Sequence, residues 1–245
     1  MTSDLILLCL AVLPVIVLSI FIYSKDKFEK EPVRMLVKAF VFGCFSVVPA
    51  VLLEQYLMMK YSANVVSVEL FNGYIVAGGS EELCKLIFLY WAVWKSKDFN
   101  EYFDGIVYAT FLSLGFACVE NILYVFQADT FITAVHTSLM RAVLSVPAHF
   151  LFAVLMGYYF ALAKFEPQSK FKNLFLAFFV PMLLHGSFDT LLFVSDTMIN
   201  ANIDWLEEAL LVLFVYFDIK MWKWGVRRVR TLQEKSAEQH RKENK

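Results

Sequence analysis

The sequence predicts an all-α fold, a polytopic bundle of about seven transmembrane helices. Hydrophobic residues make up 59% of its 245 residues and the mean hydropathy is +0.60, whereas soluble domains are about 45–50% apolar. The apolar residues form long runs, and a helix needs roughly 20 such residues to cross a hydrocarbon core of about 30 Å. Lysines and arginines gather in alternate connections between these runs. Together these observations indicate an integral membrane protein.

Seven apolar runs are long enough to span a bilayer. They cover residues 4–23, 34–54, 69–94, 105–126, 138–163, 172–194 and 205–224. The first lacks the basic start and small-residue cleavage site of a signal peptide, so we expect an anchor. The third is the longest and most polar, and its "AGGS" stretch is expected to loosen the helix. No linker divides the chain, which predicts one membrane domain over residues 1–231.

Positive charges predict the orientation of these helices. Cytoplasmic loops carry an excess of lysine and arginine. The connections after the first, third, fifth and seventh runs are basic, whereas the other connections contain only Lys60. This pattern places the N-terminus outside and the C-terminus in the cytoplasm. Residues 232–245 are too polar to bury, so we expect a loose helix end or a cytoplasmic tail.

Two other classes of function find no support in the composition. No basic patch interleaved with aromatic residues suggests nucleic-acid binding. The four cysteines fall within apolar runs and lack the spacing of a zinc knuckle or a disulfide framework. They are expected to be small hydrophobic residues buried in the membrane.

Ionisable and amide side chains at membrane depth fall in the third to sixth runs. They are Glu81, Glu82, Lys85, Glu120, Asn121, Arg141, His149, His185 and Asp189. A charge at mid-membrane costs at least about 2.5–3.5 kcal/mol, so such residues need a partner, a water-filled cavity or a function. At a helix rise of about 1.5 Å per residue, the acids and histidines lie roughly 8–18 Å below the outer boundary. We therefore expect one polar cavity enclosed by these four helices.

Helical spacing links several of these residues. Glu81 and Lys85 are four positions apart, in the order that favours a pair, and Glu82 is three positions from Lys85. His185 and Asp189 are also four apart, so Asp189 could hold one ring nitrogen of His185. Glu82 points about 100° away from Glu81 on a 3.6-residue helix. The two glutamates are therefore expected to have different roles.

Each of these polar residues or pairs, taken alone, also has a purely structural interpretation. A Glu–Lys pair within one helix can be a neutralised pair, and Glu120 with Asn121 can be an interhelical hydrogen-bond clamp. Arg141, near the outer mouth, is expected to snorkel or to bind a lipid phosphate rather than to catalyse. The complete set, however, favours chemistry over structure alone.

Acids and imidazoles permit two catalytic arrangements. In one, a glutamate is the general base on water and a histidine polarises the carbonyl. In the other, His149, His185 and a carboxylate such as Glu120 hold a zinc ion, with an open position for water. Both predict hydrolysis of an acyl bond, and we expect that bond to be a peptide bond. The sequence contains no HExxH motif, so spacing alone does not establish a metal.

Four motifs in order carry a family resemblance. They are "EELCK" in the third run, "FDGIVYA" followed by "GFACVENILYV" in the fourth, "RAVLSVPAH" in the fifth and "HGSFD" in the sixth. This set resembles the PrsW family of intramembrane proteases, within the superfamily of CAAX prenyl endopeptidases and bacteriocin-processing membrane proteins. The resemblance covers about residues 70–195. The wider superfamily usually shows EExxxR, whereas Lys85 here comes one position earlier.

The resemblance implies a multi-pass protease of the bacterial plasma membrane. Such proteases start regulated intramembrane proteolysis by cutting a single-span, membrane-anchored anti-sigma factor on its extracytoplasmic side. By motif match Glu81 and Glu82 would be the catalytic acids with Lys85 as their partner, and Glu120, His149 and His185 would complete the site. The resemblance leaves open a glutamic-type or a metal-dependent mechanism.

Two other functions remain alternatives. One is a catalytically inactive scaffold that binds a membrane partner on the same fold, although every expected acid and histidine position is filled. The other is a small proton-coupled transporter, since carboxylates, lysine and histidine also build proton relays. A transporter would favour repeat-like halves, but the polar residues lie in four consecutive helices.

Overall fold

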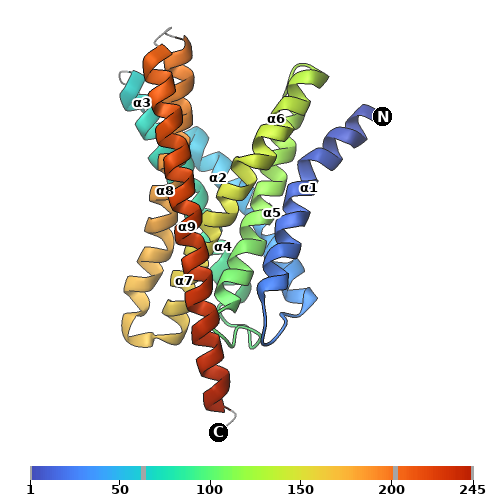
Figure 1. Cartoon of the computed structure of the whole chain (residues 1–245), viewed down its shortest axis with the longest axis vertical. Coiled ribbons are helices and arrows are strands. Elements are labelled where there is room, and N and C mark those ends of the chain that lie inside the picture. The colour runs from blue at the N-terminus through green and yellow to red at the C-terminus, as the bar shows by residue number, and fades with distance from the viewer. Residues whose placement is uncertain (1, 62–64, 201–203, 244–245) are drawn as a thin grey trace.

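The computed structural model describes residues 2–61, 65–200 and 204–243, and in this part of the chain it contains helices and no strand (Figure 1). The α-helices are α1 (Thr2–Lys25), α2 (Val33–Met58), α3 (Val65–Phe71), α4 (Gly78–Val93), α5 (Asp104–Phe126), α6 (Phe131–Val143), α7 (Ser145–Phe165), α8 (Lys170–Asn200) and α9 (Asp204–Glu243). A π-helical turn, Asn72–Ala77, joins α3 to α4, and a 3₁₀ turn, Pro167–Ser169, precedes α8. The predicted all-α class is confirmed.

Five helical stretches among the described residues are long and apolar enough to cross a membrane. They are Ser3–Lys25, Val33–Met58, Asp104–Phe126, Phe131–Phe165 and Pro167–Ser195. The third and seventh predicted runs do not reach this standard. The third carries Glu81, Glu82 and Lys85, and the seventh is interrupted by charges such as Asp218 and Lys220. The chain is thus a multi-pass membrane protein.

The third predicted run is not one regular helix. It divides into α3, the π-helical turn Asn72–Ala77 and α4, and the turn ends directly before Gly78. π-Helical turns often occur at functional sites. Glycine is required at position 78 because a Cβ there would lie 2.8 Å from the Met182 carbonyl oxygen and 2.9 Å from the Gly186 nitrogen. The start of α4 can therefore lie directly against the middle of α8.

The fifth predicted run also differs from the structure. The helix begins at Phe131, seven residues earlier than predicted, and it is broken at Leu144 into α6 and α7. Thr130 caps α6, since its side chain accepts a hydrogen bond from the Thr133 backbone. The break lies just before Pro147, whose ring excludes the regular helical position of the carbonyl four residues earlier.

The predicted tail is part of the folded structure. Helix α9 continues through Glu243 and Leu232 is fully buried. The Ser236 hydroxyl accepts a hydrogen bond of 3.0 Å from the Phe103 backbone, and the Gln233 side chain donates to the Lys25 carbonyl at 2.6 Å. The polar residues of this segment satisfy backbone groups in the connections between other helices, which is why they do not form a loose end.

Helices α5 and α7 form the centre of the bundle, between α1 and α6 on one side and α8 and α9 on the other (Figure 1). Most of their residues are buried. Helix α2 packs on α5 at backbone contact, because a Cβ on Gly115 would lie 2.0 Å from the Phe40 carbonyl oxygen. Small residues allow such close approach between membrane helices. This core fixes α4, α5, α7 and α8 around one group of polar side chains.

Candidate active site

Lys85 is the centre of the polar group. Its side chain is fully buried, and its ammonium nitrogen lies 2.9 Å from Glu81 Oε2, 2.8 Å from Glu82 Oε1 and 3.1 Å from His149 Nδ1. An ammonium group has three donors, so these acceptors use all of them. The ring of Phe116 lies over the same nitrogen at 4.1 Å from its centroid. The predicted pairing of Lys85 with both glutamates is confirmed.

His149 connects Lys85 to a second ion pair. Because an ammonium only donates, Nδ1 of His149 accepts from Lys85, and Nε2 therefore carries the hydrogen that it donates to Glu120 Oε2 at 2.7 Å. Glu120 also lies 2.9 Å from the guanidinium of Arg141. Arg141 donates through Nε to the Asn121 side-chain oxygen at 2.8 Å. His149 is thus held from both sides.

The predictions for Asn121 and for Arg141 have opposite outcomes. Asn121 does join helices, because its amide also donates to the Ala11 carbonyl at 2.6 Å. The expectation that Arg141 snorkels or binds a lipid phosphate is wrong. The side chain is 12% exposed and turns inward, because Glu120 and the Tyr124 ring, 4.2 Å from its guanidinium carbon, neutralise and cover it.

His185 lies between two carboxylates. Its Nδ1 is 2.9 Å from Glu82 Oε1 and its Nε2 is 3.2 Å from Asp189 Oδ2, which confirms the predicted pairing within α8. Phe152 stacks on the imidazole with a centroid distance of 4.7 Å. The ring is therefore fixed in position and in tilt before any substrate arrives.

Four donors could hold a metal ion. Ligand atoms of Glu81, Glu82, His149 and His185 all lie within 4.8 Å of one another, and all four residues are buried. Nδ1 of His185 lies against Glu82 and Nδ1 of His149 against Lys85, and both rings keep Nε2 for a further carboxylate, the arrangement that orients metal-binding histidines. Glu82 Oε2 is buried without a hydrogen-bond partner among the described residues. These residue types therefore fit a divalent metal that prefers nitrogen and oxygen ligands, which would take the place of the Lys85 ammonium at Glu82 and at Nδ1 of His149.

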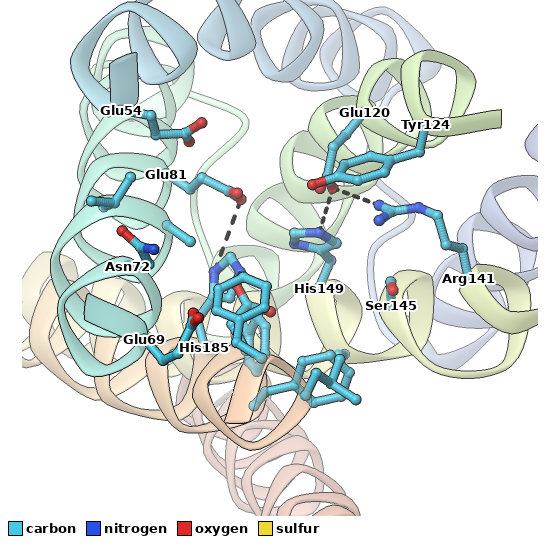
Figure 2. A pocket seen from close by; sticks show the side chains of 18 of the residues that line it. Glu54, Glu69, Asn72, Glu81, Glu120, Tyr124, Arg141, Ser145, His149 and His185 are labelled. Carbon is cyan, nitrogen blue, oxygen red and sulfur yellow. Dashed lines mark hydrogen bonds and ion pairs between the residues drawn. The ribbon is translucent and has the colours of Figure 1, made fainter. Parts of the chain in front are cut away.

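A cavity of about 300 Å³ opens onto this group. Figure 2 shows Glu81, His149 and His185 on its wall, with Glu120 and Arg141 beside them. Glu82 does not line the cavity, and it is fully buried. The two glutamates of the motif therefore differ in environment, as their spacing predicts.

The structure brings the sequence-predicted site residues into one connected network. Its members are Glu81, Glu82, Lys85, Glu120, Asn121, Arg141, His149, His185 and Asp189. The compact donor group differs from the predicted ligand set in one respect: it contains Glu81 and Glu82, whereas Glu120 binds Arg141 and His149 beside it.

Sequence reasoning missed part of the cavity wall. Glu54 on α2, Glu69 on α3, Asn72 in the π-helical turn and Tyr124 on α5 also line it. Glu54 had a visible signal, since it is an acid in the last turns of an otherwise apolar run. Its position at the predicted end of that run made an exposed side chain the simpler interpretation.

Comparison with known proteins agrees with this site. The model of the PrsW family of intramembrane metalloproteases matches residues 31–219. Protease PrsW of Clostridioides difficile (strain 630) is 38% identical over 219 residues, which are 89% of this chain and 87% of the relative. Protease PrsW of Geobacillus kaustophilus (strain HTA426) is 35% identical over 190 residues, 78% of this chain and 81% of the relative. Protease PrsW of Bacillus subtilis (strain 168) is 34% identical over 218 residues, with coverages of 89% and 91%.

No solved structure matches the chain. The family resemblance of its motifs is nevertheless confirmed by a family match over most of the chain and by relatives that are matched over most of their own length. The chain belongs to the PrsW family of intramembrane metalloproteases and is a membrane-embedded peptidase.

Proposed function

We propose that this peptidase hydrolyses a peptide bond of a single-span membrane protein near the extracytoplasmic face. One observation carries the proposal: Glu81, His149 and His185 line a cavity of about 300 Å³ within a bundle of membrane helices. An extended segment at the end of a substrate helix would bring its backbone to these side chains. A buried acid and two oriented imidazoles are groups that peptide hydrolysis needs.

We further propose that the resident metal is zinc. Glu82, His149 and His185 would hold it, and it would polarise the scissile carbonyl and lower the pKa of a bound water. Three protein ligands leave a position open for chemistry. Glu81 remains as the carboxylate on the cavity wall.

Glu81 is the general base of the proposed reaction. It takes a proton from the attacking water as the new carbon–oxygen bond forms, and it returns the proton to the nitrogen of the leaving amine as the carbon–nitrogen bond breaks. Lys85 fixes the Glu81 carboxylate through its 2.9 Å contact. Asp189 and Glu120 hold the two histidine rings in place. These residues position the reacting groups without touching the substrate.

The proposed topology has seven spans, with the N-terminus outside and the C-terminus in the cytoplasm of a bacterial cell. Alternation of basic connections supports it. In this topology the cavity opens toward the extracytoplasmic half, since Glu54 and Met58 on its wall belong to the outer end of α2. Single cysteines at Lys60 and Lys97 should react with impermeant reagent from opposite sides. Labelling of both from one side would contradict this topology.

An anti-sigma factor is the proposed substrate class, on the strength of the family resemblance. A comparison of membrane proteomes between wild type and a Glu82→Gln strain identifies the substrate directly. A single-span protein should persist uncut in the variant. Identical proteomes in both strains would remove the support for a single-span substrate.

Substitution of the site tests the proposed activity. Glu81→Ala, Glu82→Ala and His185→Ala should each abolish cleavage of a co-expressed single-span substrate, while the protein still inserts into the membrane. Asp218→Asn, on α9 and outside the cavity lining, serves as the matched control. Normal cleavage by all three variants would contradict the proposal and would favour a scaffold. Solute uptake in proteoliposomes without proteolysis would favour a transporter.

A further inference from the structure

Glu54 differs from the other acids of the cavity. Its side chain lines the cavity from α2, and Figure 2 shows its carboxylate directed inward on the same side as Glu81. Neither the hydrogen bonds nor the ion pairs between described residues include it. Glu54 is half-buried, so its carboxylate loses part of its hydration without gaining a hydrogen bond or an ion pair from the described residues.

Three other cavity carboxylates have a cationic or imidazole partner at short range. Glu81 lies 2.9 Å from the Lys85 ammonium, and Glu120 lies 2.9 Å from the Arg141 guanidinium. Asp189 lies 3.2 Å from the His185 ring. Lys85 and His185 attract the Glu54 carboxylate only at longer range, without an ion pair, because their short contacts are with the other acids.

The position of Glu54 in the cavity indicates which kind of group could neutralise its carboxylate. It lies in the last two turns of α2, and Met58 at the end of this helix and Glu69 on α3 line the same cavity. Glu54 thus places a carboxylate between the donor group and the outer end of the bundle. A cationic side chain that enters this part of the cavity would bring the missing partner.

We propose that Glu54 determines specificity by binding a lysine or arginine side chain of the substrate, close to the scissile bond. This inference rests on the proposed proteolytic function and names a chemical feature of its substrate. A buried or half-buried charge that finds its counterpart only in the complex favours the matching substrate over a neutral one by about tenfold. The same carboxylate penalises an acidic side chain at that position.

A role in proton transfer is the competing explanation for an acid at this position. Proton transfer and substrate specificity can be distinguished by how the loss of Glu54 affects different substrates. Loss of a proton-transfer group lowers turnover of every substrate alike. Loss of a specificity determinant affects only substrates that carry the charge.

The test uses purified full-length protein in proteoliposomes and a set of single-span reporters. The reporters are identical except for one position on the extracytoplasmic flank of the span, scanned residue by residue, which carries Lys, Gln or Glu. Wild type should cut the Lys reporter with a kcat/KM about tenfold above the Gln reporter at one scanned position. Glu54→Gln should cut both reporters with the same kcat/KM, and thermal unfolding in detergent near the wild-type temperature shows that it folds.

Charge reversal provides the second variant. Glu54→Lys should prefer the Glu reporter at the same position. Asp129→Asn, an exposed acid in the connection between α5 and α6, removes a charge away from the cavity and should keep the wild-type preference.

Two results would overturn the inference. One is equal cleavage of all three reporters by wild type at every scanned position. The other is an equal loss on all three reporters in Glu54→Gln, which would make Glu54 a proton-transfer group. Absence of any cleavage by wild type is a different result, because it refutes the proposed function itself.

Discussion

At the scale of single residues, Lys85 decides whether the acids can be buried together. Glu82 and Lys85 are fully buried and Glu81 nearly so. Two carboxylates this close would repel each other in a membrane interior. The three donors of one ammonium compensate both glutamates and also fix His149. Removing a single partner from such a buried group leaves an uncompensated charge, which costs more than the pair itself contributes.

Lys85→Met should therefore destabilise the protein by about 3–5 kcal/mol. For a chain of this size that corresponds to a decrease in Tm of roughly 6–20 °C. Thermal unfolding in detergent micelles measures the change. Lys220→Met, at an exposed position on α9, is the matched control and should unfold near the wild-type temperature. An unchanged Tm in Lys85→Met would show that the two acids do not depend on this ammonium.

Spacing within a helix predicted the local contacts of the site. The Glu81–Lys85 and His185–Asp189 pairs follow directly from positions four apart. Contacts between helices could not be predicted in this way. The bond from His149 to Glu120 and the inward turn of Arg141 depend on how α5, α6 and α7 cross, and no local pattern records that crossing.

At the scale of elements, small departures from regular helix position the site. The π-helical turn Asn72–Ala77 and Gly78 let the start of α4 approach α8, so that Glu82 reaches His185. The break at Leu144 separates α6 from α7 and gives Arg141 and His149 independent directions. The sequence marked both places, with glycines and with Pro147, but it did not show the type of irregularity at either place.

A second acidic group lies at the connections between helices and links them to α9. Its members Asp26, Glu31 and Glu101 are buried. The backbone N–H of Glu31 donates to the Asp26 carboxylate at 3.2 Å. On α9, Nε2 of His240 lies 3.0 Å from the Glu101 carboxylate. Burial, reinforced by the neighbouring Asp104 carboxylate, raises the pKa of Glu31 to about 11. Burial also raises the pKa of Asp26 and of Glu101.

The raised pKa of Glu31 predicts that stability falls as pH rises. The folded state keeps the Glu31 proton above pH 4.5, where the unfolded state releases it, so the folded state binds more protons. The free energy of unfolding therefore decreases with pH between about 4.5 and about 11. Tm measured in detergent should therefore be higher at pH 6 than at pH 9.

Glu31→Gln imitates the protonated form and should reduce this difference in Tm. Glu234→Gln, at an exposed position on α9, should leave it unchanged. A pH dependence of Tm that is the same in Glu31→Gln and in wild type would show that Glu31 does not carry its proton through this range.

At the scale of the whole molecule, the sequence predicted the class of fold and the gathering of polar residues. Apolar runs defined the helices, and ionisable residues in four consecutive runs predicted one cavity, because isolated charges are costly in a membrane. The cavity also takes Glu54 from α2 and Glu69 from α3, which the pattern did not predict. The polar end of α9 is packed against the connections, since its side chains bind backbone groups that only the folded bundle brings near.

The central claim is that Glu81, Glu82, His149 and His185 form a metal-dependent peptidase site. The most direct test measures the zinc content and the reporter cleavage of the same purified protein before chelation, after chelation and after reloading. Wild type should hold about one zinc per chain, lose cleavage with the metal and regain it on reloading. His149→Ala should lose both zinc and cleavage. Full cleavage by metal-free wild-type protein would contradict the claim.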